Sequence, residues 1–529
     1  MTPSSRLAAL TPLAPGAAAA PGVVLFESRG VVLVIGDGRS VVPAVGALAG
    51  ILKVVAFAPN LSEFKSGGAN VVAVGGRIVS ISGEFGAFHA QAATPGGGAA
   101  DIGKFSPNSD GSFDLVLDLS RKPLLSGNIV RLGYFAPQAD QAALDDAIAG
   151  LCSLVGRFTK RKFVDYEASL CAHGAKGLRG CTQCLQVCPA QALRSVGDFV
   201  ALDPRLCQGC AGCTLACPTG ALSFKRPSRA ALRASLRRML ERSESGPSPV
   251  IIAHVPELSA GVEADRLPAR ARTLQIDALP AFGEELWCEA LAMGAAGVVL
   301  VRDASAAREE QALLDRKVAE AQVLLCGIGV SPLRLAFVAP DALAAAVDAM
   351  PQDAARMSEP LAVGTSKRSA LLAALDTLRA VSDRAGAPVA LAPGMPFGEV
   401  SVNRTHCTLC LACANLCPMR AFAVEAEPVP KLQFIEADCV QCGLCELGCP
   451  EHAIALKPRF LPDAAARGEA RPLHEDELLS CTACDTPFIS PRLLASSLER
   501  ISGHPVLGAE GVERLKMCPA CRQHATMAG

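Results

Sequence analysis

Cysteines are the residues of this chain whose spacing points most directly to chemistry. CTLCLACANLCP (407–418) and CVQCGLCELGCP (439–450) both have the form C-x2-C-x2-C-x3-C-P. In this spacing three close thiolates hold one iron–sulfur cubane, and the cysteine before the proline reaches the cluster of the other motif. The pattern predicts two [4Fe–4S] clusters, the first on Cys407, Cys410, Cys413 and Cys449, and the second on Cys439, Cys442, Cys445 and Cys417.

A second cysteine-rich region, 165–226, holds one complete motif and one incomplete motif. CQGCAGCTLACP (207–218) is complete, whereas CTQCLQVCP (181–189) has Leu178 where its first cysteine is expected. Cys171 is the nearest upstream thiol, so the residues 172–178 are expected to enlarge the loop. The predicted clusters lie on Cys171, Cys181, Cys184 and Cys217, and on Cys207, Cys210, Cys213 and Cys188.

The missing ligand has two alternatives to Cys171. His173 is one, because nitrogen ligation of iron–sulfur clusters occurs, although thiolate is commoner. A site with only three protein ligands is the other.

Two further C-x2-C pairs stand near the C-terminus, and their ligands are Cys481, Cys484, Cys518 and Cys521. Four thiolates in two such knuckles suit tetrahedral Zn²⁺. Neither knuckle has the third close cysteine and trailing proline of a cubane motif, so zinc is favoured over a fifth cluster. His524 is a spare ligand in the same segment. A four-thiolate zinc has no open coordination position, so a structural or partner-docking role is predicted.

All four cubane motifs end alike, as CPAQAL, CPTGAL, CPMRAF and CPEHAI, which is an internal repeat. The proline opens a short helical turn, and the alanine leaves room for the backbone to approach the cluster. Short strands are expected at FVALD, ALSF, LQFIE and AIAL. These features resemble bacterial two-cluster ferredoxins, present twice, in a polyferredoxin-like arrangement at 165–226 and 401–458. The resemblance implies small α+β domains whose clusters pass single electrons.

Two regions without cubane motifs are predicted to be α/β domains. In 22–150, buried strands are expected at 31–38, 53–57, 70–76 and 114–120. A turn at Gly36-Asp37-Gly38 is favoured as structural over a nucleotide site, because the third glycine of a dinucleotide fingerprint is missing. In 248–340, strands alternate with helices, which predicts a parallel sheet.

The order of a helix, GAAGVVLVRD and a long second helix in 248–340 resembles the iron–sulfur (delta) subunit family of methyl-viologen-reducing hydrogenases. With only Cys288 and Cys326 there, a cluster in that domain is not expected. Cys326 is expected to follow a short strand, VLL. Around the C-terminal knuckles, CTACDTPF and ERLKMCPACR are similar to iron–sulfur proteins that accompany formate dehydrogenases, which implies such an enzyme as a partner.

The composition and the apolar runs argue against some classes of protein. Lysine and arginine total 50 against 51 acidic residues, and aromatic residues make up 4%, which argues against nucleic-acid binding. The apolar runs are interrupted by proline and glycine, so no transmembrane segment is expected. Residues 1–21 are predicted to be a flexible tail, 341–400 a helical connector and 478–525 the zinc-binding tail. Clustered thiolates and the lack of a strong export signal favour the cytoplasm.

The sequence therefore predicts a multidomain α/β and α+β protein with two ferredoxin-like two-cluster domains, joined by parallel-sheet α/β domains, and a zinc-ribbon-like tail. The predicted function is electron transfer through about four [4Fe–4S] clusters to or from a redox enzyme partner. Two alternatives stay open. One is a flavin- or nicotinamide-dependent oxidoreductase subunit using 22–150, and the other is an assembly factor for a metalloenzyme.

Overall fold

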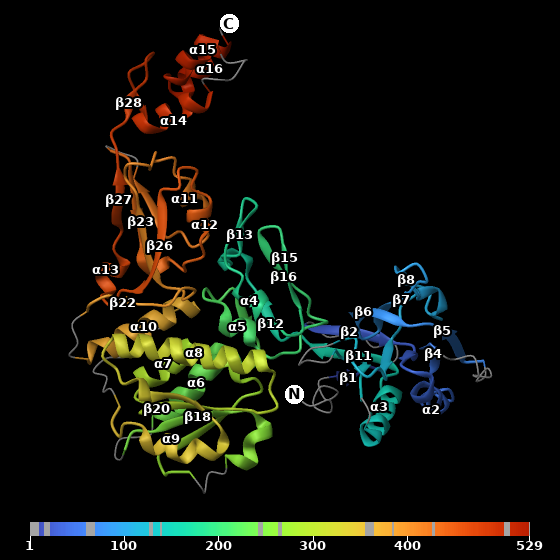
Figure 1. Cartoon of the computed structure of the whole chain (residues 1–529). Coiled ribbons are helices and arrows are strands. Elements are labelled where there is room, and N and C mark those ends of the chain that lie inside the picture. Colours follow the sequence, from blue (N-terminus) through green and yellow to red (C-terminus); the bar gives the residue numbers. More distant parts are fainter. Residues whose placement is uncertain are drawn as a thin grey trace.

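A computed structural model describes residues 10–14, 22–59, 69–125, 131–137, 140–241, 247–262, 267–354, 364, 366–382, 386–425, 429–501 and 508–527 (Figure 1). Helices and sheets are mixed throughout this part of the chain. Within it, no helix combines the length and apolar character needed to cross a membrane.

The N-terminal domain (10–161) is built on a five-stranded parallel sheet in the order β10-β9-β3-β4-β5. Its strands are β3 (Val31–Ile35), β4 (Lys53–Ala58), β5 (Val71–Gly75), β9 (Leu115–Asp118) and β10 (Tyr134–Phe135). Side chains on one face pack against α2 (Gly38–Leu48) and α3 (Gln141–Ser153). Those on the other face pack against β6 (Ile78–Glu84) and β7 (Ala87–Ala93), which pair with β8 (Ala99–Asp101). The four apolar runs expected to be strands are therefore strands. β3, β4 and β9 are buried, whereas β5, at the edge of the sheet, is partly exposed, so the expectation of burial on both faces is wrong for that run.

A second sheet, β1-β11-β2, enlarges this domain beyond the predicted limits of 22–150. Its strands are β1 (Leu10–Pro12), β2 (Val23–Ser28) and β11 (Gly156–Arg161). The prediction of a flexible tail over 1–21 is wrong for β1, because Leu10 is buried and the strand pairs with β11. The segments 1–9 and 15–21 lie outside the described residues.

The first cysteine-rich unit (164–224) consists of short paired strands and single turns of helix. Its strand pairs are β12 (Val164–Tyr166) with β17 (Leu222–Phe224), β13 (Gly174–Ala175) with β14 (Leu178–Arg179), and β15 (Leu193–Val196) with β16 (Phe199–Leu202). Helices α4 (Gln183–Gln186) and α5 (Gly212–Ala216) lie inside the two cysteine motifs. The loop expected to be enlarged is the β13–β14 hairpin.

The middle domain (229–380) has a four-stranded parallel sheet in the order β19-β18-β20-β21. The strands are β18 (Val250–His254), β19 (Ala271–Gln275), β20 (Gly297–Val301) and β21 (Leu335–Val338). The helices are α6 (Arg229–Leu240), α7 (Glu284–Ala292), α8 (Arg308–Gly327), α9 (Leu343–Ala349) and α10 (Lys367–Ala380). Alternate residues of β18 and β20 enter two cores, one with α7, α8 and α10 and the other with α9. Cys326 lies in the last turn of α8, so the strand expected before it is wrong.

The second cysteine-rich unit (389–475) has two three-stranded sheets, β22-β26-β23 and β24-β25-β27. Its strands are β22 (Val389–Ala390), β23 (Gly398–Val402), β24 (Phe422–Glu425), β25 (Lys431–Phe434), β26 (Ile454–Phe460) and β27 (Arg471–Glu475). Its helices are α11 (Ala412–Leu416), α12 (Leu444–Leu447) and α13 (Ala464–Gly468). Because β27 pairs with β25, this unit extends beyond the predicted boundary at 458.

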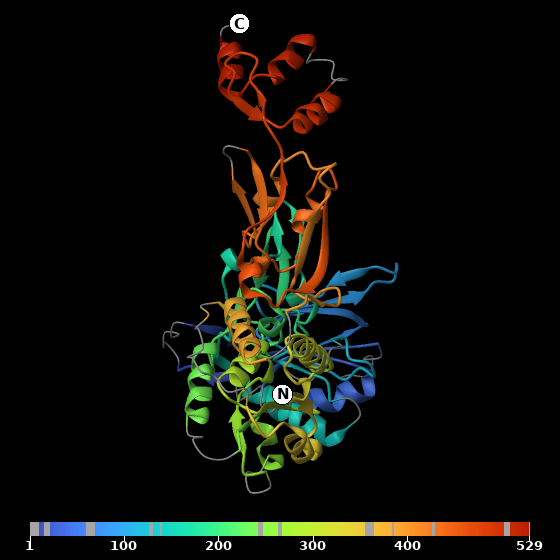
Figure 2. The ribbon, with the colours of Figure 1, turned by 90° about the vertical axis from the view of Figure 1, so that its left-hand side faces the viewer.

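The C-terminal tail (479–527) projects from the second cysteine-rich unit, which it contacts through Ser490 and Arg500 (Figure 2). It contains the hairpin β28 (Leu479–Ser480) and β29 (Pro487–Ile489), followed by α14 (Pro491–Ile501), α15 (Gly508–Leu515) and α16 (Pro519–Met527). The first C-x2-C pair therefore lies in a hairpin, and the second begins a helix.

Lys160, on β11, joins the N-terminal domain to the first cysteine-rich unit. Its side chain is 3% exposed, and Nζ donates to the carbonyl oxygens of Arg205 at 2.6 Å and Cys207 at 3.1 Å. Burial lowers the pKa of Lys160 to about 8. Arg205 lies just before the motif 207–218, and Cys207 is the first cysteine of that motif.

Lys160→Met should weaken this contact, because it leaves two carbonyl oxygens without their donor at a cost of about 1–3 kcal/mol each. We expect faster amide hydrogen exchange over 203–209, measured by mass spectrometry. Lys162→Met, at an exposed position of the same segment, is the matched control. Equal exchange in both variants would contradict the role given to Lys160.

Candidate metal centres

A single cavity is lined by Cys407, Cys410, Cys413 and Cys449. Apolar side chains complete its wall, including Leu409, Leu432 and Ile454. The cysteines come from both motifs, so the fourth ligand crosses from one motif to the other, as the spacing requires.

The incomplete motif builds a matching cavity. This cavity is lined by Cys171, Cys181, Cys184 and Cys217. The β13–β14 hairpin folds back on itself, with the Cys181 N–H donating to the Ala172 carbonyl at 2.9 Å. The residues inserted after Cys171 are thereby looped out, and the structure brings Cys171 together with the other three thiols.

His173, the alternative ligand, is held by two hydrogen bonds. Its Nδ1 lies 2.8 Å from the Cys181 carbonyl oxygen, and its Nε2 lies 2.7 Å from Ser195 Oγ. Both ring nitrogens therefore have partners, and the side chain is buried. This geometry favours Cys171 as the fourth ligand and gives His173 the task of fixing the loop.

For the other two predicted sites, the evidence is the effect that neighbouring thiols have on the pKa of each cysteine. Burial and then neighbouring charges, Cys188 among them, raise the pKa of Cys207, Cys210 and Cys213. Cys417 has the same effect on Cys439, Cys442 and Cys445. In each group the cysteine before the proline lies close to the three cysteines of the other motif.

Backbone N–H groups point at the sulfur atoms of three motifs. Ala192 donates to Cys188 Sγ, Ala421 to Cys417 Sγ and Ala453 to Cys449 Sγ, all at 3.3 Å. The residue before each alanine has a positive φ, between 47° and 55°, which turns the following amide toward the sulfur. The repeated alanine of the sequence thus marks a donor to a thiolate.

In the fourth motif a side chain, and not a backbone N–H group, lies against the sulfur atom of the cysteine before the proline. Thr219 Oγ1 lies 3.5 Å from Cys217 Sγ and accepts a hydrogen bond from the Ala221 N–H at 3.2 Å. The threonine hydroxyl is therefore interposed between the amide and the sulfur. The sequence offered no signal for this role beyond the position of Thr219 within the motif.

The donor set fits an iron–sulfur cluster. Every side chain predicted to bind is a thiol, and soft thiolates select metals such as iron in clusters and zinc. Burial raises the pKa of Cys184 and of Cys413 to about 12, so these thiols ionise at neutral pH only when a bound metal stabilises the thiolate.

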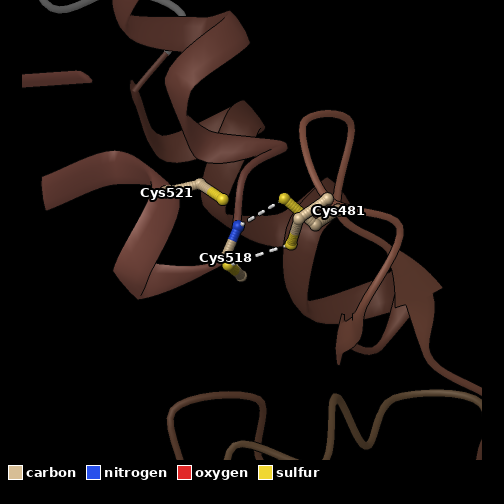
Figure 3. A group of neighbouring side chains, drawn as sticks. Cys481, Cys518 and Cys521 are labelled. Atoms are coloured by element: carbon tan, nitrogen blue, oxygen red, sulfur yellow. Dashed lines mark hydrogen bonds between the residues drawn. The ribbon is translucent and has the colours of Figure 1, made fainter. Parts of the chain in front are cut away.

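The sulfur atoms of Cys481, Cys484, Cys518 and Cys521 all lie within 4.8 Å of one another (Figure 3). Burial opposes ionisation of Cys481, but backbone N–H groups, those of Cys518 at 3.2 Å and Ala483 at 3.4 Å among them, lower its pKa to about 6. His524 lies on α16 and is not a member of this group. The four thiols can hold one tetrahedral ion.

Two further features that the sequence singled out lie outside these cysteine sites. Cys288 is buried in α7, within the core of the middle domain. In the turn at residues 36–38, the Asp37 carboxylate accepts a hydrogen bond from the Ser40 N–H at 2.9 Å, which lowers the pKa of Asp37. A negative side chain thus lies at the helix start where a phosphate would bind.

Cys171→Ala should remove about four iron atoms per chain, because the cavity loses one of its four thiolates. Iron quantitation on anaerobically purified protein measures the loss. Cys326→Ala, at an exposed cysteine outside all motifs, is the control. Full iron content in Cys171→Ala, together with a loss in His173→Gln, would assign the ligand to the histidine instead.

Thr219→Val should lower the reduction potential of the site that contains Cys217, because a donor to sulfur stabilises the more negative reduced form. One hydrogen bond of about 1 kcal/mol corresponds to roughly 40 mV for one electron. A redox titration followed by electron paramagnetic resonance measures the shift, with Thr219→Ser as the variant that keeps the hydroxyl. An unchanged potential would show that the Ala221 amide donates to the sulfur in its place.

Comparison with known proteins gives two matches. The family model of the 4Fe-4S dicluster domain matches residues 406–453. An uncharacterized ferredoxin of Methanocaldococcus jannaschii is 39% identical over 49 residues, which is 9% of this chain and 76% of that protein. The family match lies outside the middle domain and the tail, where the resemblances to hydrogenase and formate dehydrogenase partners stay predictions. The second cysteine-rich unit binds [4Fe–4S] clusters, and through these matches the chain belongs to the ferredoxin family of iron–sulfur proteins.

Proposed function

We propose that this protein is an electron carrier that relays single electrons through four [4Fe–4S] clusters to or from a redox partner. The observation that supports this most is the cavity lined by Cys171, Cys181, Cys184 and Cys217, which matches in donor set the cavity in the family-matched unit. A bound [4Fe–4S] cluster supplies reversible one-electron chemistry.

The chain's own residues have three tasks in this function. Thiols from two motifs hold each site. Backbone amides such as those of Ala192 and Ala421 donate to the sulfur atoms and thereby help to set the potential. Apolar side chains limit the access of water, because Leu222 and Val200 line one cavity and Leu432 and Ile454 the other.

The cysteine group of the C-terminal tail is proposed to bind Zn²⁺ and to stabilise the tail. Two backbone N–H groups donate to the sulfur atom of Cys481 and favour its thiolate form. Four thiolates satisfy the tetrahedral preference of zinc. With four sulfur ligands the ion has no position open for a substrate, so the site supports docking or folding and not catalysis.

Metal quantitation joined to electron paramagnetic resonance tests the proposal on anaerobically purified protein. We expect about sixteen irons and about one zinc per chain, and reversible reduction by a low-potential reductant. Cys481→Ser should lower zinc and leave iron unchanged, because the tail site is separate from the cubane motifs.

Other results would favour the alternatives. About eight irons would mean that one unit holds no clusters. Clusters that fail to cycle reversibly would indicate a structural role, as in an assembly factor. Flavin absorbance, or bleaching of the clusters by a nicotinamide nucleotide, would indicate an oxidoreductase that uses the N-terminal domain.

A further inference from the structure

We propose that the four cysteine sites form one continuous row across the two cysteine-rich units, and that Lys367, Arg368 and Gly180 are the positioning residues that hold the row together at its middle. This inference rests on the proposed function. It also gives a role to the loop inserted after Cys171.

Lys367 and Arg368 are the first two residues of α10, and both are buried. Lys367 Nζ donates to the carbonyl oxygens of Thr214 at 3.0 Å and Leu215 at 2.7 Å. These carbonyl groups belong to α5, between the ligands Cys213 and Cys217. One positive charge of the middle domain is therefore fixed to the first cysteine-rich unit.

Arg368 makes the equivalent contact with the second unit. Its guanidinium donates to the carbonyl oxygens of Cys439 at 2.6 Å, Ala437 at 2.7 Å and Pro396 at 2.7 Å. Cys439 is itself a predicted ligand. Two consecutive residues of one helix thus bind the backbone of cluster-bearing segments in both units.

The packing of apolar side chains continues this connection. Leu215 and Ala216 of α5, the leucines of α10, and Phe397 and Phe460 of the second unit all belong to the same hydrophobic core. Arg467, on α13 of the second unit, also binds Asp376 of α10 through both carboxylate oxygens at 2.7 Å. A shared core of this kind holds the two units as one body.

On the side away from α10, the two units contact each other directly. The hairpin β13–β14 lies against α12 (Figure 1). A Cβ atom at Gly180 would be 2.8 Å from Leu444 Cγ and 3.1 Å from the Cys442 carbonyl oxygen. Only a residue without a side chain allows this approach, and Gly180 directly precedes the ligand Cys181.

The contacts between the elements that carry the cysteines give the order of the sites. Cys181 follows Gly180, whose backbone lies against the Cys442 carbonyl of the other unit. Within the first unit α4, which carries Cys184, packs against α5, which carries Cys213, and within the second α11, which carries Cys413, packs against α12, which carries Cys445. The order is therefore the site of Cys207, the site of Cys171, the site of Cys439 and the site of Cys407.

The two ends of the row lie at different parts of the chain. Lys160 of the N-terminal domain donates to the carbonyl oxygen of Cys207 at one end. At the other end, Ser490 of the C-terminal tail donates to the carbonyl oxygen of Thr408 at 2.8 Å. Partners docking at the N-terminal domain and at the tail would each meet an outer site.

Gly180→Leu tests the row, because it adds a side chain where the two units touch. Arg179→Leu, which adds the same side chain at an exposed neighbouring position, is the control. The readout is the spin–spin interaction between clusters in the electron paramagnetic resonance spectrum of the fully reduced protein. We expect Gly180→Leu to lose the part of the interaction that joins the two units, with iron content unchanged and Arg179→Leu like the parent.

Arg368→Met is a second variant that loosens the junction from the α10 side. We expect amide hydrogen exchange over 439–445 to become about tenfold faster, since three charge-assisted hydrogen bonds are removed. If Gly180→Leu loses iron from the neighbouring site, the amide exchange of Arg368→Met decides whether the junction between the two units holds the row together.

An unchanged interaction in Gly180→Leu, together with unchanged amide exchange in Arg368→Met, would overturn the row. A parent spectrum equal to the sum of two independent units would also overturn it. Neither result would affect the proposed electron-carrier function, which is tested by the metal content and by the reversible reduction of the clusters. The two proposals therefore fail through different measurements.

Discussion

The rest of this structure depends on sulfur atoms that must carry negative charge while they are buried. Cys210 and Cys184 illustrate the difficulty, because burial raises the pKa of each thiol to about 12. A bound metal cluster would compensate much of that charge, and hydrogen bonds from backbone amides compensate more. The turns that follow three of the four motifs meet this need, since each aims an N–H group at a sulfur atom.

The same need explains why basic side chains of other domains enter the cysteine-rich units. Lys160, Lys367 and Arg368 are all buried, and each donates to backbone carbonyl groups beside ligand cysteines. A buried cation is costly unless it is hydrogen-bonded, and here the carbonyl oxygens satisfy it. Positive charge near a cluster also favours the reduced state, so the contacts that join the domains also act on the sites.

The middle domain has the position of a scaffold between the two units. Its helices α6, α7 and α10 pack on one core that extends into α5 of the first unit and to Phe397 and Phe460 of the second. The two cysteine-rich units are far apart in sequence, yet they share this core and a direct contact at Gly180. The long segment between the units is therefore part of the arrangement of the sites and more than a linker.

The sequence by itself determined what depends on local spacing. The grouping of cysteines from both motifs of the second unit and the strands at 31–35 and 297–301 were predictable, because motif spacing and apolar runs express contacts within a few residues. The roles of Lys367 and Arg368 were not predictable. In the sequence, two basic residues at the start of a helix cannot be told from a solvent-exposed pair, because the carbonyl groups of residues 214 and 439 that they bind are far away along the chain. Only the tertiary structure decided that Cys171 joins Cys181, that β27 and β1 complete sheets, and that the sites of the two units meet at Gly180. Each of these depends on hydrogen bonds or close packing beyond the reach of a local motif, and such contacts exist only once the chain has folded.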